Sequence, residues 1–533
     1  MSEDKLWGIK KRGMNMRQTF IKGTFIILVA SFVTRILGFV YRILLSRIIG
    51  AQGMGLYQMA YPTITVAVTL VTGGLPIAIA KLVAEAEARQ EPEKVRTILW
   101  QSLAVVGVLS LLCVAGMYWA APGLTRLLKD PRAHIVILAM IPVLPITGVA
   151  AVFRGYFQGK QNMIPSAVSV TVEQVARIGL SIWLAWHLLP YGIAVSAAGA
   201  MLGMVGGELC GLLILLWHYR RQRSSVRAST PTLTASEQAT TFSALMQLSI
   251  PMTASRLVGT VSYFLEPILV AQSLAIAGFA SPEATGMYGQ LAGMAIPLLL
   301  FPTVLTYALS VSLVPAVSEL ATFRHMPRIR RRVRQSMRLA LLAGVPFSLL
   351  LTVLAEPICH LVYGVPEVGR LLQLMAPFSL FLYFQGPLNA TLQGLGQART
   401  AMINSFAGAM LKFTAILLLA TRPYLGITGV AMAIVLSFAG VTVLHWLSVS
   451  RRIGSTLRAS DFLKVGASCV GMAATVHLLL PLTSHFSLLS QLVVLISASL
   501  VSYGAGLLFT GAVTQRDVAR LPKVGPILSR WFS

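Results

Sequence analysis

The chain has 533 residues, of which 56% are hydrophobic and 11% are charged, and its formal net charge is +26 at pH 7. Apolar runs of twenty or more residues recur along nearly the whole length, which excludes an ordinary soluble domain and predicts an all-α polytopic membrane protein. The basic residues lie between these runs without a base-stacking pattern, so we expect anionic membrane lipids and no nucleic acid as partners.

Fourteen membrane-spanning helices are predicted in chain order. A basic leader, residues 1–21, precedes them and has no small-residue cleavage site, so we expect it to be retained in the cytoplasm. Several spans contain proline, which a membrane helix tolerates with a kink. The predicted spans are 22–48, 57–80, 97–121, 135–157, 163–188, 193–217, 243–275, 286–317, 338–357, 371–393, 402–420, 426–449, 464–482 and 489–512.

The first span contains arginines at depths that are costly in a bilayer. Arg35 lies near its middle, and an arginine there costs roughly 2.5–3.5 kcal/mol on insertion scales. Arg42 follows two turns later on nearly the same face, about 10 Å along the axis, with Gly38 between them. Both arginines could snorkel or pair with buried carboxylates. We favour a second interpretation, in which they line a water-filled cavity that receives an anion.

The distribution of Lys and Arg predicts the orientation. Most of them lie before the first span, after every second span and in the tail, which places both termini in the cytoplasm. The segments that would then be external contain far fewer: Arg126, Lys129, Arg132, Arg370 and Arg422.

Further charges lie inside predicted spans. Glu173 and Arg177 are spaced i,i+4 and can pair on one helix face, and Glu208 lies in the next span. Arg256 and Glu266 are about 80° apart around the seventh span, so direct pairing requires a bend at the adjacent proline. Glu266 is a candidate for protonation or cation coupling, or for pairing with a cation of the other half.

The two halves of the chain resemble one another. The segment around Arg35 is echoed around Arg256, and Gln158-Gly159 of the fourth span is echoed by Gln393-Gly394 of the tenth. The spacing from each glutamine to the next buried cation, Arg177 or Lys412, is the same. This predicts two parallel six-helix repeats around a central cavity, with a site at their interface.

The repeat also predicts the domain boundaries. Beyond the leader we expect a first six-helix bundle, a cytoplasmic linker, a second six-helix bundle, an appended helix pair and a cytoplasmic tail. These cover residues 22–217, 218–242, 243–450, 464–512 and 513–533. The arginine-rich segment Arg324–Arg338 is expected to be a solvated anchor facing lipid, with a regulatory or partner-binding role as the alternative.

The sequence offers no catalytic, metal-binding or cofactor motif. It has no G-x-S-x-G, H-E-x-x-H or Walker-type loop, and the four cysteines form no C-x-x-C pair. We therefore expect neither an enzyme nor a cofactor. Arg35 and Arg256, opposed across a cavity, would suit a phosphate-bearing ligand because the guanidinium fork matches phosphate oxygens.

The opening TRILGFVYRILLSRIIGAQGMGLYQMAYP, followed by GGLPIAIAKLVAE and FRGYFQGKQNMIPSAVSVTVEQVARI, resembles the family of stage V sporulation protein B and the MurJ-like lipid II flippases. These belong to the multidrug/oligosaccharidyl-lipid/polysaccharide exporter superfamily. The resemblance implies a plasma-membrane flippase for lipid II or another polyprenyl-diphosphate-linked glycan, acting in spore cortex peptidoglycan synthesis. It also implies that Arg35 binds the diphosphate. The second arginine of that family falls at Tyr41, with Arg42 one residue later, and its arginine pair in span two has no counterpart here.

The candidate substrate-binding residues are Arg35, Arg42, Arg177, Arg256 and Lys412, and the candidate coupling or structural carboxylates are Glu173, Glu208 and Glu266. We expect a monomer, with cell-wall synthesis proteins as further partners. The alternatives are a cation-coupled multidrug exporter of the same superfamily, a polytopic glycan-polymerising enzyme and a scaffold. A drug exporter for cations would favour buried carboxylates, whereas this chain has more buried cations than acids.

Overall fold

The computed structural model describes the backbone of residues 3–223 and 234–513, and the side chains of these residues except for 3–33, Arg35, Gln222, Arg223 and Leu305. In this part of the chain every regular element is a helix. The all-α prediction is confirmed. The contacts divide the chain into two compact units, Met1–Ala275 with Phe279–Gly289, and Ile276–Gly278 with Gln290–Ser533.

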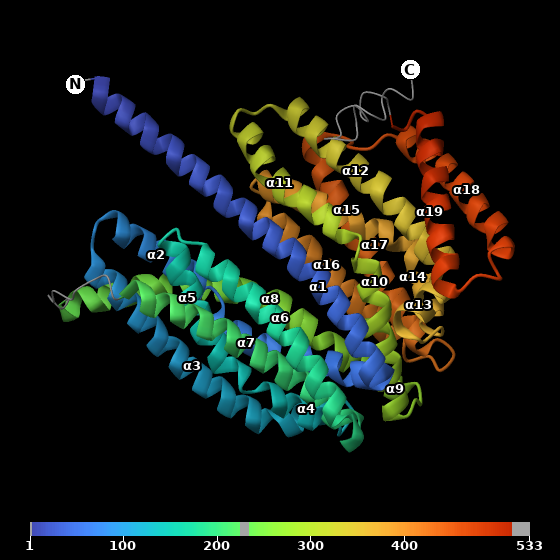
Figure 1. The fold of residues 1–533 in the computed structure, drawn as a ribbon, viewed down its shortest axis with the longest axis horizontal. Coiled ribbons are helices and arrows are strands. Elements are labelled where there is room, and N and C mark those ends of the chain that lie inside the picture. Colours follow the sequence, from blue (N-terminus) through green and yellow to red (C-terminus); the bar gives the residue numbers. More distant parts are fainter. Residues whose placement is uncertain (1–2, 224–233, 514–533) are drawn as a thin grey trace. The chain divides into compact units, whose positions relative to one another are not determined.

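In its described residues the first unit contains nine α-helices, which Figure 1 shows in blue to green. Several begin with a proline in the first turn, where its missing N–H has no helical partner to lose. The helices are α1 (Glu3–Thr72), α2 (Leu75–Ala88), α3 (Pro92–Leu127), α4 (Ala133–Met140), α5 (Val143–Gly159), α6 (Ile164–Leu188), α7 (Ile193–Arg223), α8 (Ala235–Ile276) and α9 (Ser281–Tyr288), with a 3-10 turn at Leu189–Tyr191.

The second unit contains ten α-helices in the part of the chain up to residue 513 that the structure describes. The chain enters it through a π-helix, Gly289–Ala295, and a 3-10 turn, Ala376–Phe378, precedes α15. The helices are α10 (Ile296–Leu300), α11 (Thr303–Thr322), α12 (Met326–Val353), α13 (Ala355–Tyr363), α14 (Val368–Met375), α15 (Ser379–Gly394), α16 (Ala398–Leu419), α17 (Gly426–Ile453), α18 (Ala459–Leu482) and α19 (Leu488–Phe509).

Twelve helical segments in the described residues are long and apolar enough to cross a membrane. They match the predicted spans except at two places. The first two predicted spans are merged into Ile36–Ala88, although this segment bends at Gly50 and is interrupted after Thr72. The predicted span 286–317 is divided among α9, the π-helix, α10 and α11 and is not among the twelve.

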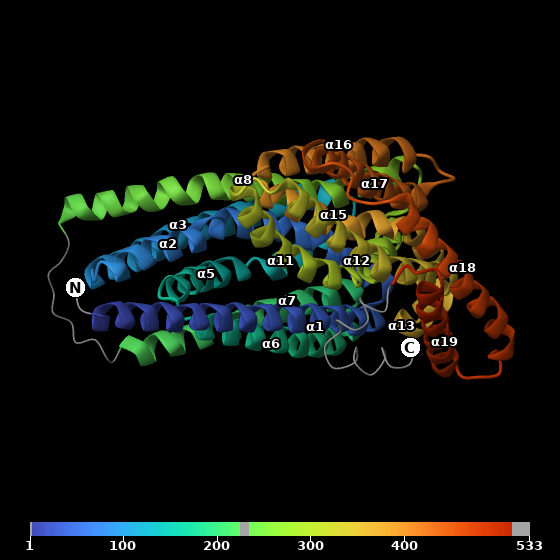
Figure 2. The ribbon, with the colours of Figure 1, turned by 90° about the horizontal axis from the view of Figure 1, so that it is seen from above.

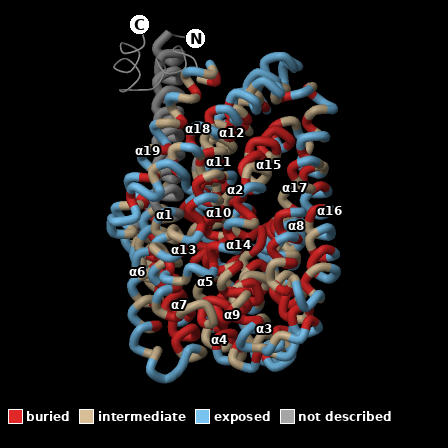
Figure 3. Tube along the Cα trace, turned by 90° about the vertical axis from the view of Figure 1, so that its right-hand side faces the viewer, coloured by how far each residue is buried: buried red, intermediate tan, exposed pale blue. Residues whose placement is uncertain are grey.

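The exposed surface of these helices is apolar, as expected of helices that face lipid. In α3, Leu111 is 72% exposed and Trp119 is 87% exposed, although this helix has a mean hydropathy of 2.2 over its most apolar window. Figure 3 contrasts α15, in which most residues are buried, with α16, in which many are exposed. A chain that exposes this much apolar surface on its spanning helices is a multi-pass membrane protein.

Two expected boundaries differ from the observed helices. Residues 1–21, the expected leader, belong to α1 from Glu3 onward, and their location in the cytoplasm stays a prediction. The expected linker 218–242 is shorter, because α7 continues to Arg223 and α8 begins at Ala235. Part of the linker and the tail, 224–233 and 514–533, lies outside the described residues.

Each unit has its own hydrophobic core. In the first, buried side chains from α2, α3, α5, α7 and α8 form one cluster that includes Ile79, Ile98, Phe157, Leu215 and Leu245. Thus α8 packs with the first unit, although the sequence repeat places it at the start of the second half. The boundaries 22–217 and 243–450 stay a prediction about the repeat.

In the second unit, one core cluster joins α12 and α15 to the C-terminal pair α18 and α19. It includes Val333, Leu388, Met472 and Leu495. The Tyr503 hydroxyl of α19 donates a hydrogen bond to the Leu342 carbonyl of α12. The appended pair, which Figures 1 and 2 show side by side, therefore braces α12.

Equivalent packing in the two units supports the predicted repeat. A Cβ on Gly159 of α5 would lie 2.6 Å from Val83 Cβ and 2.8 Å from the Ala80 carbonyl oxygen of α2. A Cβ on Gly394 of α15 would lie 2.8 Å from Val317 Cβ and 2.9 Å from the Val314 oxygen of α11. Both glycines of the Gln-Gly motif thus admit a neighbouring helix at the same place, which agrees with the predicted repeat.

A buried carboxylate fastens the turn between α3 and α4 to α9 within the first unit. Asp130, whose side chain is 1% exposed, accepts hydrogen bonds from Arg132 N, Nε and Nη2 at 3.0, 3.1 and 2.9 Å. The Thr285 hydroxyl of α9 donates to Asp130 Oδ2 at 2.6 Å. Arg132 Nη1 also donates to Gln52 Oε1 of α1 at 3.2 Å. One acid therefore connects three parts of the unit.

Candidate functional site

A polar cavity of about 160 Å³ lies between α1 and α6 in the first unit. At about 30 Å³ per water molecule it would hold roughly five waters. Among the described side chains, two arginines, Arg42 and Arg177, contribute to its lining, and no acidic residue does. The other lining residues are Thr34, Gly38, Tyr41, Leu45, Met54, Tyr57, Gln58, Tyr61 and Gln174.

Helix geometry explains how α1 supplies most of this lining. Thr34, Gly38 and Arg42 are spaced four residues apart and lie on one face. Gly50 adopts φ 65°, a left-handed conformation that glycine adopts at little cost, and there α1 bends. The part of α1 beyond this bend returns to the same cavity with Tyr57 and Tyr61, whose rings stack at 6.1 Å. Figure 2 shows α1 beside α6 and α7.

Arg177 also belongs to a cluster of four charged side chains from three helices. Its Nη2 donates to Glu173, one turn earlier on α6, and lies 3.4 Å from Glu208 Oε1 of α7. Arg154 of α5 donates through Nη2 to Glu173 Oε2 at 2.6 Å and lies 3.5 Å from Glu208 Oε2. With all four ionised the cluster is neutral. In the described residues no carboxylate lies within ion-pair distance of Arg42, which faces the same cavity.

Glycines on α7 make this cluster possible. A Cβ on Gly207 would lie 2.7 Å from Arg177 Cβ, and one on Gly211 would lie 3.0 Å from Glu173 Cβ. The absence of side chains at these positions lets α7 approach α6 closely. Glu208, next to Gly207, thereby comes within reach of both arginines, and small residues at such crossings are typical of membrane helices.

The predicted site residues divide into several groups. The structure brings Arg42 and Arg177 to one cavity, and it shows the expected Glu173–Arg177 pair. The Arg35 side chain lies outside the described residues, so its role stays a prediction. Arg154 was missed as a member of this site. An arginine inside the predicted span 135–157 was a signal that a buried partner was needed.

Arg256 lies elsewhere, at the break between α1 and α2. Its Nη1 donates to the Gly73 carbonyl oxygen at 2.9 Å, and the Thr253 hydroxyl oxygen accepts from Gly74 N at 2.9 Å. These α8 side chains satisfy backbone groups near the break, where the helix is interrupted. Arg256 is not among the residues that line the Arg42 cavity. The opposition of Arg35 and Arg256 stays a prediction.

Two candidates are not among the residues that line this cavity. Glu266 is half-buried on α8, directly before Pro267. Lys412 is on α16 of the second unit, with its Nζ 5.3 Å from the centre of the Phe413 ring. Their proposed roles in coupling and binding stay predictions. The described residues contain no group of three or more His, Cys, Asp or Glu that could hold a metal ion.

The model of the family described as "Polysaccharide biosynthesis protein" matches residues 20–321, more than half of the chain. The chain belongs to the polysaccharide biosynthesis protein family. A second model, MatE, matches residues 269–417. Stage V sporulation protein B of Bacillus subtilis (strain 168) is 46% identical over 84% of this chain and 86% of the relative. Lipid II flippase MurJ of the same strain is 24% identical over 74% of this chain and 76% of its own length.

Solved structures show the same fold in transporters. An inward closed conformation of lipid II flippase MurJ aligns with a TM-score of 0.69 at 15% identity, covering 92% of this chain and 99% of that one. An inward-facing multidrug resistance MATE family transporter of the MOP superfamily aligns with a TM-score of 0.64 at 14% identity, covering 79% and 94%. These structural matches confirm the predicted transporter fold. None of these names describes an enzyme.

Proposed function

We propose that the protein is a flippase that moves a polyprenyl-diphosphate-linked glycan across the plasma membrane by alternating access. The observation that carries this proposal is the cavity lined by Arg42 and Arg177, inside a membrane-spanning member of the polysaccharide biosynthesis family. A charged side chain inside a membrane-spanning protein costs free energy to bury, so a cavity lined with arginines indicates that they bind an anionic ligand.

The chemistry of the lining favours phosphate. A guanidinium presents a planar fork of N–H donors that matches phosphate oxygens, and a charge-assisted hydrogen bond is roughly twice as strong as a neutral one. The buried Nε of Arg177 has no hydrogen-bond acceptor among the described atoms. The cavity of about 160 Å³ is smaller than the roughly 300–1,000 Å³ of drug-sized sites. It would hold phosphate groups and leave the glycan outside.

We infer that the substrate is lipid II and that the pathway is peptidoglycan synthesis, in particular of the spore cortex. The names of two relatives, stage V sporulation protein B and lipid II flippase MurJ, support this assignment. The Lys and Arg distribution supports cytoplasmic termini. Arg35 completes the proposed diphosphate site on α1, and Arg256, Lys412 and Glu266 are proposed to act in later steps of transport.

The MatE match raises a second candidate, a cation-coupled multidrug exporter. A cationic drug would need a carboxylate in its site. None of the described acidic residues lines the Arg42 cavity, and the nearby Glu173 and Glu208 are paired with Arg154 and Arg177. The charges of this cavity therefore favour an anionic ligand.

The proposal is tested by reconstituting the full chain in liposomes with fluorescent lipid II and measuring the fraction that moves between leaflets. Arg42→Ala and Arg42→Lys should each reduce the flipping rate at least tenfold, because lysine keeps the charge but lacks the fork. Arg399→Ala is the control, since Arg399 is exposed and has no described ion pair. Wild-type rates in both Arg42 variants would overturn the proposal.

A second arm distinguishes the substrates. The same liposomes are assayed with a polyprenyl-diphosphate glycan that lacks the peptide and, separately, with a fluorescent cationic drug. Flipping of lipid II and not of the drug is expected. The spore role is tested by expressing the chain in a Bacillus subtilis strain that lacks stage V sporulation protein B and counting heat-resistant spores.

A further inference from the structure

The first turns of α12 in the second unit are unusually rich in arginine, and the helix sorts these arginines onto separate faces. One face packs in the core of the unit. Ile329, Val333 and Met337 are each at most 1% exposed and recur every four residues. The arginines lie on the two remaining faces, which have different surroundings.

The second face consists of Arg330, Arg334 and Arg338, again four residues apart, and it holds the C-terminal pair. Arg330 Nε donates to the Ser455 carbonyl oxygen at 2.8 Å, and Arg334 Nη2 donates to Asp461 Oδ2 at 3.1 Å. Arg338 donates to the Ala512 carbonyl oxygen. These three arginines are structural.

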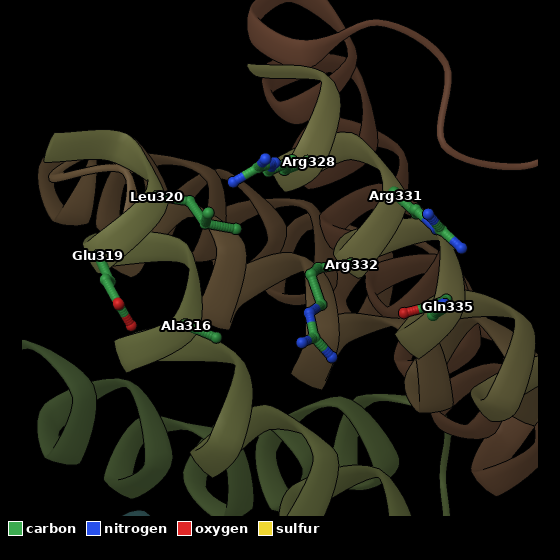
Figure 4. Close-up of a pocket in the computed structure, with 7 residues that line it drawn as sticks. All are labelled: Ala316, Glu319, Leu320, Arg328, Arg331, Arg332 and Gln335. Atoms are coloured by element: carbon green, nitrogen blue, oxygen red, sulfur yellow. The ribbon is translucent and has the colours of Figure 1, made fainter. Parts of the chain in front are cut away.

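The third face consists of Arg328, Arg331 and Arg332, with Gln335 one turn later. Their spacing of i, i+3, i+4 and i+7 forms one stripe. All four are exposed, and the described residues form no ion pair with these three arginines. They line a pocket of about 500 Å³ whose other wall is α11 (Figure 4).

The α11 wall leaves the pocket open and adds little opposing charge. It consists of Ala316, Glu319 and Leu320. Figure 4 shows Glu319 across the pocket from the arginines, and no described ion pair joins it to them. Three guanidinium groups and one carboxylate give the lining a net charge of about +2 at neutral pH. A pocket of this charge suits a phosphate group, because a guanidinium offers a fork of N–H donors to phosphate oxygens.

The same stripe becomes apolar where α12 continues toward the membrane. Leu339, one turn beyond Gln335, is 50% exposed. α12 is among the helices that are apolar enough to span a membrane. Its arginine donors therefore lie at the end of the span, and an exposed apolar side chain follows them in the direction of the membrane. A lipid has the matching order, with a phosphate headgroup and then an acyl chain.

We propose that this pocket binds the phosphate headgroup of an anionic lipid from the adjacent leaflet. The proposal concerns a second site, in the other unit from the Arg42 cavity, and does not rest on the flippase function. It assigns the two arginine faces different roles: Arg330, Arg334 and Arg338 hold the helix pair, whereas Arg328, Arg331 and Arg332 hold a lipid.

The test uses the full chain purified in detergent, with bound lipid counted by native mass spectrometry during titration with phosphatidylglycerol or phosphatidylcholine. The variant is Arg328→Gln, Arg331→Gln and Arg332→Gln together. The matched control is Arg399→Gln, Arg451→Gln and Arg452→Gln, which removes the same charge from exposed arginines of the same unit. Thermal unfolding of both variants checks folding, and inorganic diphosphate is added as a competitor.

We expect phosphatidylglycerol to bind the wild type in preference to phosphatidylcholine, the pocket variant to bind it at least tenfold more weakly, and the control to stay within about twofold. Millimolar diphosphate should weaken lipid binding to the wild type, because it competes for the same guanidinium groups. Equal losses in both variants would show that net charge, and not this pocket, attracts the lipid. Unchanged binding in the pocket variant, or a wild type that binds diphosphate but not phosphatidylglycerol, would equally overturn the proposal.

Discussion

Replacing Asp130 by alanine tests whether the carboxylate between α3, α9 and Arg132 stabilises the first unit. The substitution removes the acceptor of one hydrogen bond from Thr285 and three from Arg132. Thr285 is 1% exposed, so its hydroxyl would lose its acceptor in a place with little access to water. Leaving such a group unsatisfied costs about 1–3 kcal/mol.

Losing the hydrogen bonds from Arg132 should destabilise the protein less than losing a fully buried ion pair would. Its side chain is 31% exposed and still reaches Gln52, so water and that amide can replace part of the lost contact. We therefore expect Asp130→Ala to lower the free energy of unfolding by about 2–4 kcal/mol. Asp130→Asn should lose about half as much. The asparagine side chain retains one oxygen as an acceptor. If its NH2 group takes the Oδ2 position, that group faces the Arg132 Nη2 donor, and two donors cannot form a hydrogen bond.

The assay is thermal unfolding of the purified protein in detergent. At about 2 °C per kcal/mol for a unit of this size, Asp130→Ala should lower Tm by about 4–8 °C. Glu283→Ala is the control, because Glu283 is exposed on α9 and has no described ion pair. A Tm for Asp130→Ala equal to that of the control would refute the reasoning.

The pH dependence provides a second check. Burial alone would raise the pKa of Asp130, but the hydrogen bonds from Arg132 and Thr285 outweigh it and hold the pKa below its usual value. The stabilisation by the carboxylate is therefore complete above the unfolded-state pKa of about 3.9 and is lost as the pH falls through the lower folded pKa. The Tm difference between wild type and Asp130→Asn should be largest near neutral pH and should shrink in acid.

Three further experiments test the site and the topology. Gly207→Ala should push α7 away from α6 and lower the free energy of unfolding by about 1–3 kcal/mol. Gly179→Ala is the control, because a Cβ at Gly179 meets nothing within 4 Å, and it should be neutral or stabilising in the same Tm assay. Arg154→Ala should cost about 3–5 kcal/mol, because Glu173 and Glu208 would share one arginine, and an unchanged Tm would show that the cluster does not stabilise the fold. In a cysteine-free background, Cys at Lys129 should react with an impermeant thiol reagent in intact cells and Cys at Ser229 should not; the reverse pattern would overturn the orientation.

Much of the fold follows from hydropathy, because a spanning helix needs a long apolar run whatever its neighbours are. The breaks are harder to predict. Pro76 begins α2 just after an interruption, whereas Pro62 lies inside α1 without ending it. The difference is tertiary, since α8 supplies Arg256 and Thr253 to the backbone near the first break.

The site was predictable only where it depends on one helix. The i,i+4 spacing of Glu173 and Arg177 predicts their pair, and the structure shows it. The contributions of Arg154 and Glu208 come from other helices and depend on the close approach at Gly207, which periodicity along one segment cannot reveal. The arginines of α12 were expected to form one solvated surface. Only the structure separates those that hold the C-terminal pair from those that line a pocket.

The equivalent packing of Gly159 and Gly394 has a consequence for how substitutions are tolerated. Each glycine faces a valine Cβ and a backbone carbonyl oxygen of the helix it contacts, and neither of these can move aside easily. The two positions are far apart in the gene but should therefore tolerate the same substitutions. In a saturation mutagenesis library, a substitution that reduces fitness at Gly159 should also reduce it at Gly394, so measurements on one half of the chain would predict those on the other.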